Sequence, residues 1–437
     1  MTRPFRNIFP LFFSICFACL ISACSNSDGV DNANYDEIII NSEEYWNTKV
    51  DHPSLDDREY PYAGIPRIVI ETVNHQEIRD RETEVPAKLQ IWGENAPESE
   101  VMNLTIRGRG NSSWKEMPKK SYKLEFTNKQ GILGMPKDRD WALIANYADK
   151  TLMKNYLIYH LAAKFGTYYA PRCEFAELYL NKEYLGVYLL TETIKFSKNR
   201  IAIPKTENSY IVEFDVKYKE DETVIFPSIL NRYKPFHIHF PKTISDTSAD
   251  KLTSHIQRFE QFLKNTQYAT FKDIEEWLDI ESFEIHFWIQ EFSKNPDANY
   301  FTSVYFTWVE NGKIKMGPVW DFDIAFGGHY EKNVISYDNW RTKYSYWGEY
   351  LFANKEFERN VNSFWIKNHD IFDNSLATID SLEKKLNDAA ENNFKRWDIL
   401  QKDGKWISKS VKNYNEAVCN LKNWIKNRIQ WIDENIY

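Results

Sequence analysis

The sequence predicts an α+β protein in which a β-rich lobe precedes a mostly helical lobe, with a cleft between the two. Alternating β-branched segments crowd the first part of the chain, and helical apolar spacing dominates from about residue 248 onward. The 437 residues exceed one average domain of about 100–200 residues, so more than one lobe is expected. Hydrophobic residues make up 43% and charged residues 27%, which excludes a disordered or fibrous chain.

The N-terminus has the pattern of an export signal. Arg3 and Arg6 precede a mostly apolar run over residues 8–21, and small residues lead to Cys24. The run ISAC at residues 21–24 resembles a bacterial lipobox, which implies removal of residues 1–23 and a diacylglyceryl group on Cys24. A plain signal peptide followed by a coincidental cysteine is the alternative. We therefore expect an extracytoplasmic protein that is lipid-anchored to a bacterial membrane, at the outer membrane or cell surface.

The region after Cys24 is polar and acidic, and we expect residues 24–60 to be a solvated tether. No later stretch is long and apolar enough to cross a bilayer, so membrane contact is expected through the lipid only. Cys173 and Cys419 are the only other cysteines outside the signal; a disulfide between them is possible, but two cysteines do not make a disulfide scaffold. The net charge of −8 disfavours nucleic acid as a partner.

The β-rich lobe is predicted from period-two alternation, because alternate side chains of a strand share one face. Strands are expected over residues 65–71, 87–92, 103–107 and 122–126. Helical spacing then appears over residues 149–166, with Asp149 as N-cap and Gly166 as a stop.

Strands and helices continue to alternate toward the C-terminus. We expect a hairpin over residues 177–190, a strand over 210–214, helices over 248–292, a hairpin over 300–319 turned at Asn311-Gly312, and a helical tail over 352–437. The predicted organisation is a domain over residues 61–345 with a helical extension of the same lobe over 346–437.

A basic, glycine-rich loop is the first candidate site. Arg107 and Arg109 belong to the run RGRGNSSW at residues 107–114, and the run PKKSYK follows at residues 118–123. Backbone amides, serines and cations in such a loop can wrap anionic oxygens. A β-turn with solvated arginines is the alternative, but a basic cluster in an acidic chain favours phosphate.

Acidic residues flank the predicted hairpin over residues 300–319. Asp297 and Asn299 precede it, and Asp321 and Asp323 follow it in the apolar run PVWDFD. If the backbone stays extended, the carboxylates of Asp321 and Asp323 share a face and can coordinate a hard divalent cation. A surface turn is the alternative. Protein kinases place a catalytic Asp and a metal-binding Asp one hairpin apart in this way.

Five ordered motifs together resemble the CotH family, whose spore-coat members are atypical kinases. They are RGRGNSSW at 107–114, PKKSY at 118–122, WALIANYADK at 141–150, YLGVY at 184–188 and PVWDFD at 318–323. The resemblance covers about residues 65–328 and implies an atypical bilobal protein-kinase-like fold.

The resemblance also implies roles for individual residues. Asp297 matches the catalytic Asp and Asp321 the magnesium Asp, with Asp323 and Asn299 as further ligands. Lys120 or Lys123 would touch the nucleotide phosphates, flanked by Arg107 and Arg109, and Asp149 or Glu192 would orient a lysine or line the nucleotide cleft. The chain departs from ordinary kinases because it lacks a full Gly-x-Gly-x-x-Gly and a His-Arg-Asp, and Asp297 and Asn299 are closer than the usual Asp-x4-Asn spacing.

The resulting functional expectation is phosphoryl transfer from ATP, with Mg²⁺, to a protein hydroxyl. A lipoprotein outside the cytoplasm meets little ATP, so the alternative is a weak or inactive surface scaffold that recognises a glycan or a host protein. A glycosidase using Asp321 and Asp323 is weaker, because the two carboxylates are too close in sequence to flank a sugar. His237 and His239 could be a metal pair, but without a third ligand nearby we favour surface histidines.

Overall fold

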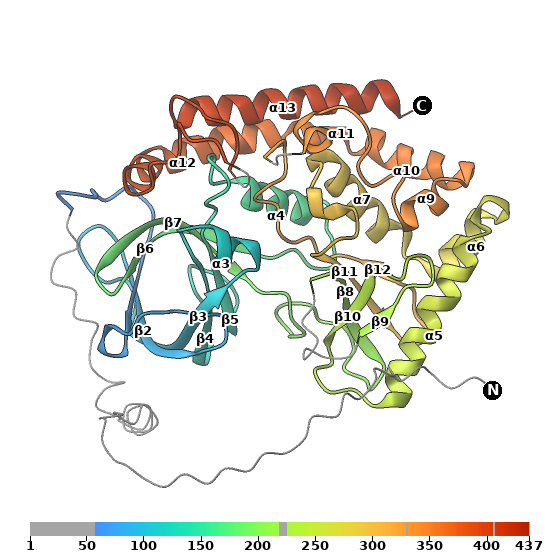
Figure 1. The fold of residues 1–437 in the computed structure, drawn as a ribbon, viewed down its shortest axis with the longest axis horizontal. Helices are drawn as coiled ribbons and strands as arrows, with labels where there is room; N and C mark the ends of the chain where they lie inside the picture. The colour runs from blue at the N-terminus through green and yellow to red at the C-terminus, as the bar shows by residue number, and fades with distance from the viewer. Residues whose placement is uncertain (1–56, 218–224, 329–330, 405–406, 437) are drawn as a thin grey trace, which may run out of the picture. The chain divides into compact units, whose positions relative to one another are not determined.

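A computed structural model describes residues 57–217, 225–328, 331–404 and 407–436, all within one compact unit. The expected signal peptide, Cys24 and nearly all of the expected tether lie outside these residues. The mixed α+β class is confirmed: the N-terminal region is β-rich and the C-terminal region is helical (Figure 1). Among the described helices, none combines the length and apolar character that a membrane span requires.

The N-terminal strands close into a seven-stranded barrel. Its strands, in barrel order, are β1 (Arg67–Thr72), β2 (Val85–Trp92), β3 (Met102–Arg109), β4 (Ser121–Gln130), β5 (Asp138–Ile144), β7 (Glu183–Glu192) and β6 (Cys173–Leu180). All neighbours are antiparallel except β1 and β6, whose parallel pairing closes the ring. Side chains alternate along β3 between buried and half-buried, as the sequence pattern predicts for a sheet with one face in a core.

The barrel interior is a separate apolar core, and Leu89, Leu104, Ile106, Leu124 and Trp141 are all buried in it. Closure removes exposed strand edges, which an open sheet would have to protect in another way. Strand β5 was not among the predicted strands, although part of it falls within the WALIANYADK motif.

A second sheet carries the strands that follow the barrel. It is antiparallel throughout, with the order β12 (Lys315–Met316), β11 (Val304–Val309), β8 (Ser209–Phe214), β10 (Pro235–Phe240) and β9 (Ile225–Pro227). The predicted hairpin over residues 300–319 is confirmed by the pairing of β11 with β12, and Asn311 adopts the left-handed conformation at its turn.

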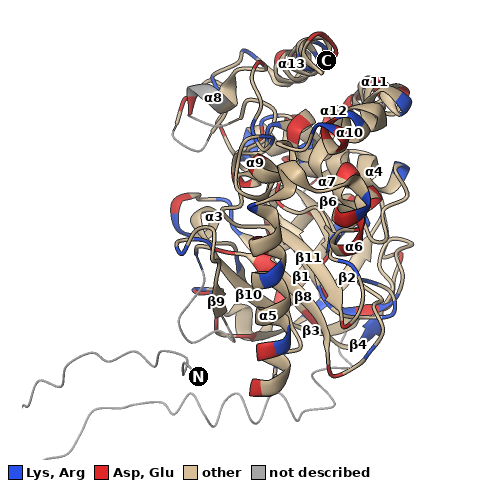
Figure 2. Cartoon of the chain, turned by 90° about the vertical axis from the view of Figure 1, so that its right-hand side faces the viewer, with Lys and Arg blue, Asp and Glu red and all other residues tan. Residues whose placement is uncertain are grey.

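Eleven helices are assigned within the described residues. They are α3 (Ser112–Glu116), α4 (Lys154–Lys164), α5 (Asp246–Leu263), α6 (Phe271–Trp277), α7 (Ile280–Ser293), α8 (Lys332–Ile335), α9 (Trp347–Leu351), α10 (Lys355–Lys367), α11 (His369–Asp373), α12 (Ser375–Arg396) and α13 (Tyr414–Asn435). Figure 2 shows acidic and basic residues interspersed along α5, whose apolar residues, including Leu252, Ile256 and Phe259, are buried. This is the amphipathic pattern that the sequence predicts.

Helix α4 begins later than predicted. The predicted N-cap, Asp149, lies ahead of the helix, whose first residue is Lys154. The Asp149 carboxylate, in the loop before the helix, nevertheless accepts a hydrogen bond from the Lys154 backbone N–H at 2.9 Å. It therefore pairs with one of the N–H groups that the first helical turn leaves without an intrahelical acceptor.

The C-terminal helix α12 packs against strand β7 of the barrel. At this contact the buried Lys119 ammonium donates to the Val187 carbonyl at 2.5 Å and to the Asn393 side-chain oxygen at 2.9 Å. The Val187 N–H donates to the same Asn393 oxygen at 3.1 Å. The barrel and the helical region therefore share a buried polar contact as well as apolar surface.

Candidate active site

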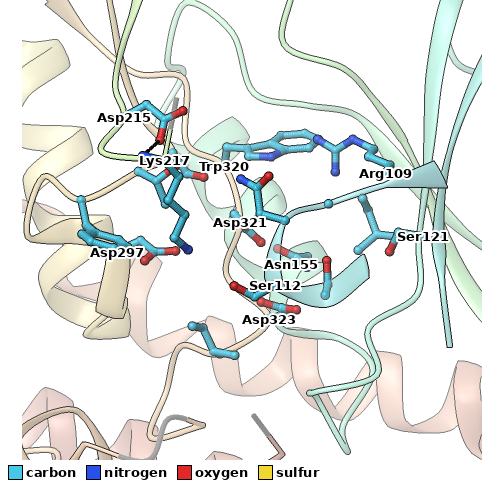
Figure 3. A pocket seen from close by; sticks show the side chains of 18 of the residues that line it. Arg109, Ser112, Ser121, Asn155, Asp215, Lys217, Asp297, Trp320, Asp321 and Asp323 are labelled. Atoms are coloured by element: carbon cyan, nitrogen blue, oxygen red, sulfur yellow. Dashed lines mark hydrogen bonds between the residues drawn. The ribbon is translucent and has the colours of Figure 1, made fainter. Parts of the chain in front are cut away.

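A cavity of about 1010 Å³ is lined by residues from the barrel, the second sheet and the segments that follow α7 and β12. Figure 3 shows Arg109, Ser112 and Ser121 on one side of it, Asp215, Lys217 and Asp297 on the other, and Asp321 and Asp323 between them. The cavity thus collects residues that lie far apart in the sequence, which only the tertiary fold can bring together.

Asp297 is held by the turn that ends α7. Lys294 ends the helix in the left-handed conformation, and Asp297 follows in a short 3-10 turn, Pro296–Ala298. The Asn295 side chain accepts a hydrogen bond from the Asp297 N–H at 3.3 Å and donates one to the Asp321 carbonyl at 3.1 Å. Asn295 therefore ties the Asp297 turn directly to the segment that carries the other two aspartates.

Asp321 and Asp323 leave the second sheet just after β12. Asp321 has a left-handed backbone with φ of 67°, a region that Asp and Asn adopt more readily than most residues. The Phe322 N–H donates to the Asn155 side chain of α4 at 2.7 Å, and the Phe322 ring is fully buried. Asp321 and Asp323 both line the cavity, although the backbone there is not the extended one on which the expectation of a shared face depended.

Burial raises the pKa values of all three half-buried aspartates, and the charge of Asp321 adds to the effect on the other two. Burial, followed by the charge of Asp321, raises the pKa of Asp297 to about 7. Burial also raises the pKa of Asp321, against the opposing effect of Arg109, and burial with Asp321 raises that of Asp323 well above its usual range. Among the described residues, none donates a hydrogen bond to these three carboxylates. The cluster therefore lacks hydrogen-bond donors, and burial outweighs the effect of the nearby cations on the pKa values. A bound cation would relieve this condition.

Cationic side chains surround this acidic cluster. The Arg109 guanidinium lies 4.8 Å from the centre of the Trp320 ring, and Lys217 lines the opposite side of the cavity. Lys234 donates to the Asn299 carbonyl at 2.5 Å, and burial together with Arg341 lowers the pKa of Lys234 to about 8. Arginine and lysine side chains beside a carboxylate cluster suit a ligand that brings both phosphate groups and a divalent cation.

The glycine-rich loop lies at the barrel side of the cavity. Gly108 packs against its own loop so closely that a Cβ would lie 2.5 Å from the Trp114 ring, and Gly110 has a φ of 103°. Both positions therefore require glycine. Arg107 lines the cavity, but its guanidinium also forms an ion pair with Glu84 at 3.6 Å. This pairing partly neutralises its charge.

Three residues predicted to bind nucleotide do not line the cavity. Lys120 donates to the Trp114 carbonyl at 2.5 Å, and Lys123 pairs with Glu125 at 2.9 Å and with Asp140 at 3.3 Å. Glu192 is fully buried beside Arg172 and Arg200, at 2.7 and 2.6 Å. The structure thus corrects these three predictions, because each side chain is engaged by other groups outside the cavity lining, whereas Lys119 and Ser121, on either side of Lys120, do line the cavity.

Asp149, the other acidic residue predicted for the cleft, is outside the cavity lining as well, and it caps α4 instead. Conversely, sequence reasoning missed many lining residues, among them Asn155, Lys217, Lys234 and Arg341. None of these four belongs to a recognisable motif.

Two further observations concern the histidines and the cysteines. His237 and His239 line the cavity rather than the outer surface, and Glu213 provides the third metal-ligating side chain that the sequence did not reveal. This corrects the expectation of surface histidines. Cys173 and Cys419 are both free, the first half-buried in β6 and the second exposed in α13, so the structure contains no bridge between them.

A family model described as CotH kinase protein matches residues 106–432, which include the glycine-rich loop, all three aspartates and most of the C-terminal helices. No curated protein matches the chain. The match covers most of the sequence and agrees with the motifs that suggested the family. The chain therefore belongs to the CotH family of kinase-like proteins.

Proposed function

We propose that this protein transfers a phosphoryl group from ATP, with Mg²⁺, to a hydroxyl group of a protein. The observation that carries the proposal is the convergence of Asp297, Asp321 and Asp323 with Arg109 and Lys217 in one cavity. We further propose that the barrel and the region with the second sheet act as the two lobes of a kinase-like arrangement, since the cavity is lined from both.

The residues present fit magnesium and a nucleotide. Carboxylate oxygens are the ligands that Mg²⁺ prefers. Burial raises the pKa values of Asp321 and Asp323, so a bound cation would stabilise their charged forms. These two side chains would hold the ion, with Asn299 as a further oxygen donor at the cavity wall. The ion, when bound, neutralises charge on the transferred phosphates.

The remaining steps belong to side chains of this chain. Arg109 and Lys217 are suited to bind phosphate oxygens, and Arg109 is held in place by its contact with Trp320. Asp297, whose pKa is raised to about 7, can accept the proton of an acceptor hydroxyl near neutral pH and orient that hydroxyl. Lys120, Lys123 and Glu192 are not part of this proposal.

The decisive experiment is thermal unfolding of the purified protein with and without Mg²⁺ and ATP. A ligand that binds only the folded state adds roughly 2.7 kcal/mol at 100 times its dissociation constant. We expect this shift in the wild type and its loss in Asp321→Asn, a substitution that tolerates the left-handed backbone better than alanine does. Asp388→Asn, at an exposed position of α12, should keep the shift.

The opposite result has a clear meaning. A cooperative transition with no shift in the wild type would sink Mg²⁺-ATP as the ligand, and the cavity would then be assigned to another phosphorylated donor or to a surface scaffold. Where a shift is found, incorporation of labelled phosphate into a protein acceptor distinguishes a kinase from a protein that only binds nucleotide.

We also propose that the protein is exported and lipid-anchored through Cys24, on the lipobox-like run at residues 21–24. Incorporation of a labelled fatty acid and partition into a detergent phase should both be lost in Cys24→Ala. If the wild-type protein takes up no label, the cysteine follows an ordinary signal peptide, and the lipid anchor is ruled out.

A further inference from the structure

A second cluster of metal-ligating side chains lies in the wall of the same cavity, on the second sheet. His237 and His239 are two residues apart on β10, so both imidazoles lie on one face of the strand. Glu213 lies opposite His237 on the neighbouring strand β8. One ligand atom from each of the three side chains lies within 4.8 Å of the other two.

The Glu213 carboxylate is already positioned for this role. One of its oxygens accepts a hydrogen bond from the Ser303 N–H at 2.7 Å and lies 3.3 Å from the Thr302 hydroxyl. The other oxygen lies 2.5 Å from Nε2 of His239. The backbone N–H of Ser303, just ahead of β11, therefore orients the carboxylate through one oxygen, while the second oxygen lies beside His239. Outer-shell hydrogen bonds orient ligands in this way at metal sites.

We propose that Glu213, His237 and His239 form a binding site for a divalent transition-metal ion of the zinc type. Two imidazoles and one carboxylate are an established ligand set for such ions, and three protein ligands leave a position open for water or a substrate. The three residues line the cavity, so the open position is accessible from it.

This site differs from the aspartate cluster in its ligand chemistry. Asp297, Asp321 and Asp323 offer oxygen only, which suits Mg²⁺, whereas imidazole nitrogen selects zinc, copper, nickel or iron over magnesium. Zinc at about 2.0–2.1 Å from each ligand atom places those atoms about 3.3 Å from one another. Side-chain rotation within the observed 4.8 Å limit is enough to reach that arrangement.

The competing interpretation is an ion pair between Glu213 and His239 that needs no metal. The two readings differ in what they require of His237, which is buried and plays no part in that pair. If the three residues bind a metal, replacing His237 must lower the affinity for zinc. If Glu213 and His239 form only an ion pair, the wild-type protein binds no zinc at this position.

The test is zinc binding by the purified protein after its metals have been removed with a chelator, without Mg²⁺ or ATP. A Cys419→Ser background removes the exposed thiol as an unrelated zinc ligand. Titration with zinc chloride against a chromophoric chelator should give one equivalent bound. His239→Gln and His237→Asn should each weaken zinc binding by at least about tenfold, since losing a ligand costs no less than losing an outer-shell partner. Cobalt substitution should give visible absorption bands that both variants lose.

The matched control is His75→Gln. His75 pairs with Glu71 on the barrel and so offers an imidazole and a carboxylate without the second histidine; its replacement should leave the bound zinc unchanged. If the His237→Asn variant does not fold, the His239→Gln variant alone tests the proposal. The His239 side chain is 26% exposed, so its replacement should disturb the fold less.

Several outcomes would overturn the proposal. They are failure of the wild type to bind an equivalent of zinc, survival of the bound zinc in His239→Gln, and its disappearance in Asp321→Asn. The last result would assign the metal to the aspartate cluster. Because Asp321→Asn should keep zinc, loss of the nucleotide site and loss of this site can be told apart.

Discussion

The barrel and the cavity both bury carboxylates, but the two regions compensate the charges differently. Glu192 at the end of β7 is fully buried and accepts hydrogen bonds from Arg172 at 2.7 Å, from Arg200 at 2.6 Å and from Tyr169 at 3.1 Å. Asp321 and Asp323 have no such donors among the described residues, and the charge of Asp321 raises the pKa of Asp323. Burial of a carboxylate therefore does not mark a site by itself. Several poorly compensated carboxylates that line one cavity are the stronger sign of a site.

The largest expected effect on stability comes from removing the buried carboxylate of Glu192, whose charge is compensated by arginines. Glu192→Ala leaves the buried Arg200 without its carboxylate, so we expect a loss of about 3–5 kcal/mol in the free energy of unfolding. Urea denaturation measures it. The matched control is Glu183→Ala on the same strand, where the carboxylate is 62% exposed beside Arg396 and should contribute less than about 1 kcal/mol. Similar losses in the two variants would contradict the comparison.

A second prediction uses a poorly compensated carboxylate outside the cavity. Burial and Glu281 raise the pKa of Glu284 in α7 to about 7, against the opposing charge of Lys367. Since its ordinary pKa is 4.5, the folded state binds the proton more tightly, and the contribution to stability is lost as the pH rises from about 4.5 to 7. The expected loss is about 1–3 kcal/mol.

Glu284→Gln should remove this pH dependence and leave the nucleotide-dependent shift intact. Denaturant unfolding of both proteins at pH 5 and pH 7.5 measures the difference. An unchanged slope with pH in the variant would mean that another group causes it.

The third prediction concerns the cavity itself. Asp323→Asn removes a negative charge next to Asp321, so the protein without ligand should become more stable, by about 1 kcal/mol. The same variant should lose stabilisation by Mg²⁺ and ATP. Thermal unfolding reports both quantities in one series. A variant that is destabilised without ligand would show that the Asp323 carboxylate has a structural partner.

The smallest expected effect comes from Lys123, and a comparison with Arg109 tests which of these two barrel residues binds the nucleotide. Lys123→Ala should change stability by less than about 1 kcal/mol, because its partners Glu125 and Asp140 are partly exposed, and it should leave nucleotide affinity unchanged. Arg109→Gln should weaken the nucleotide by about tenfold, through loss of a charge-assisted contact. Equal effects on affinity would place Lys123 at the ligand after all.

Local patterns predicted much of this molecule. Alternation located β1, β3 and β4, helical spacing located α5 and α13, and the acidic residues on both sides of the β11–β12 hairpin led directly to Asp297 and Asp321. These features depend on residues close in sequence, where periodicity carries information about which face is buried.

Features that depend on distant residues were not predictable in this way. Closure of the barrel depends on parallel pairing of β1 with β6. The position of His237 opposite Glu213 depends on the register of β8 and β10, which are neighbours in the sheet but not consecutive in the sequence. Lys120 and Lys123 were predicted to touch the nucleotide, but a motif gives no side-chain direction, and Lys119 is the lysine of this run that lines the cavity. Glu192 was misassigned because its partner Arg200 belongs to a later loop.

The contact between Lys119 and Asn393 has a consequence for how the molecule is made. Every barrel strand is complete by residue 192, yet one acceptor of the buried Lys119 ammonium is synthesised 274 residues after the lysine. A nascent chain that emerges from its N-terminus can therefore form the barrel hydrogen bonds early, but it completes the environment of that lysine only when α12 arrives. A fragment that stops before α12 would keep the Val187 acceptor of Lys119 but lack the Asn393 acceptor.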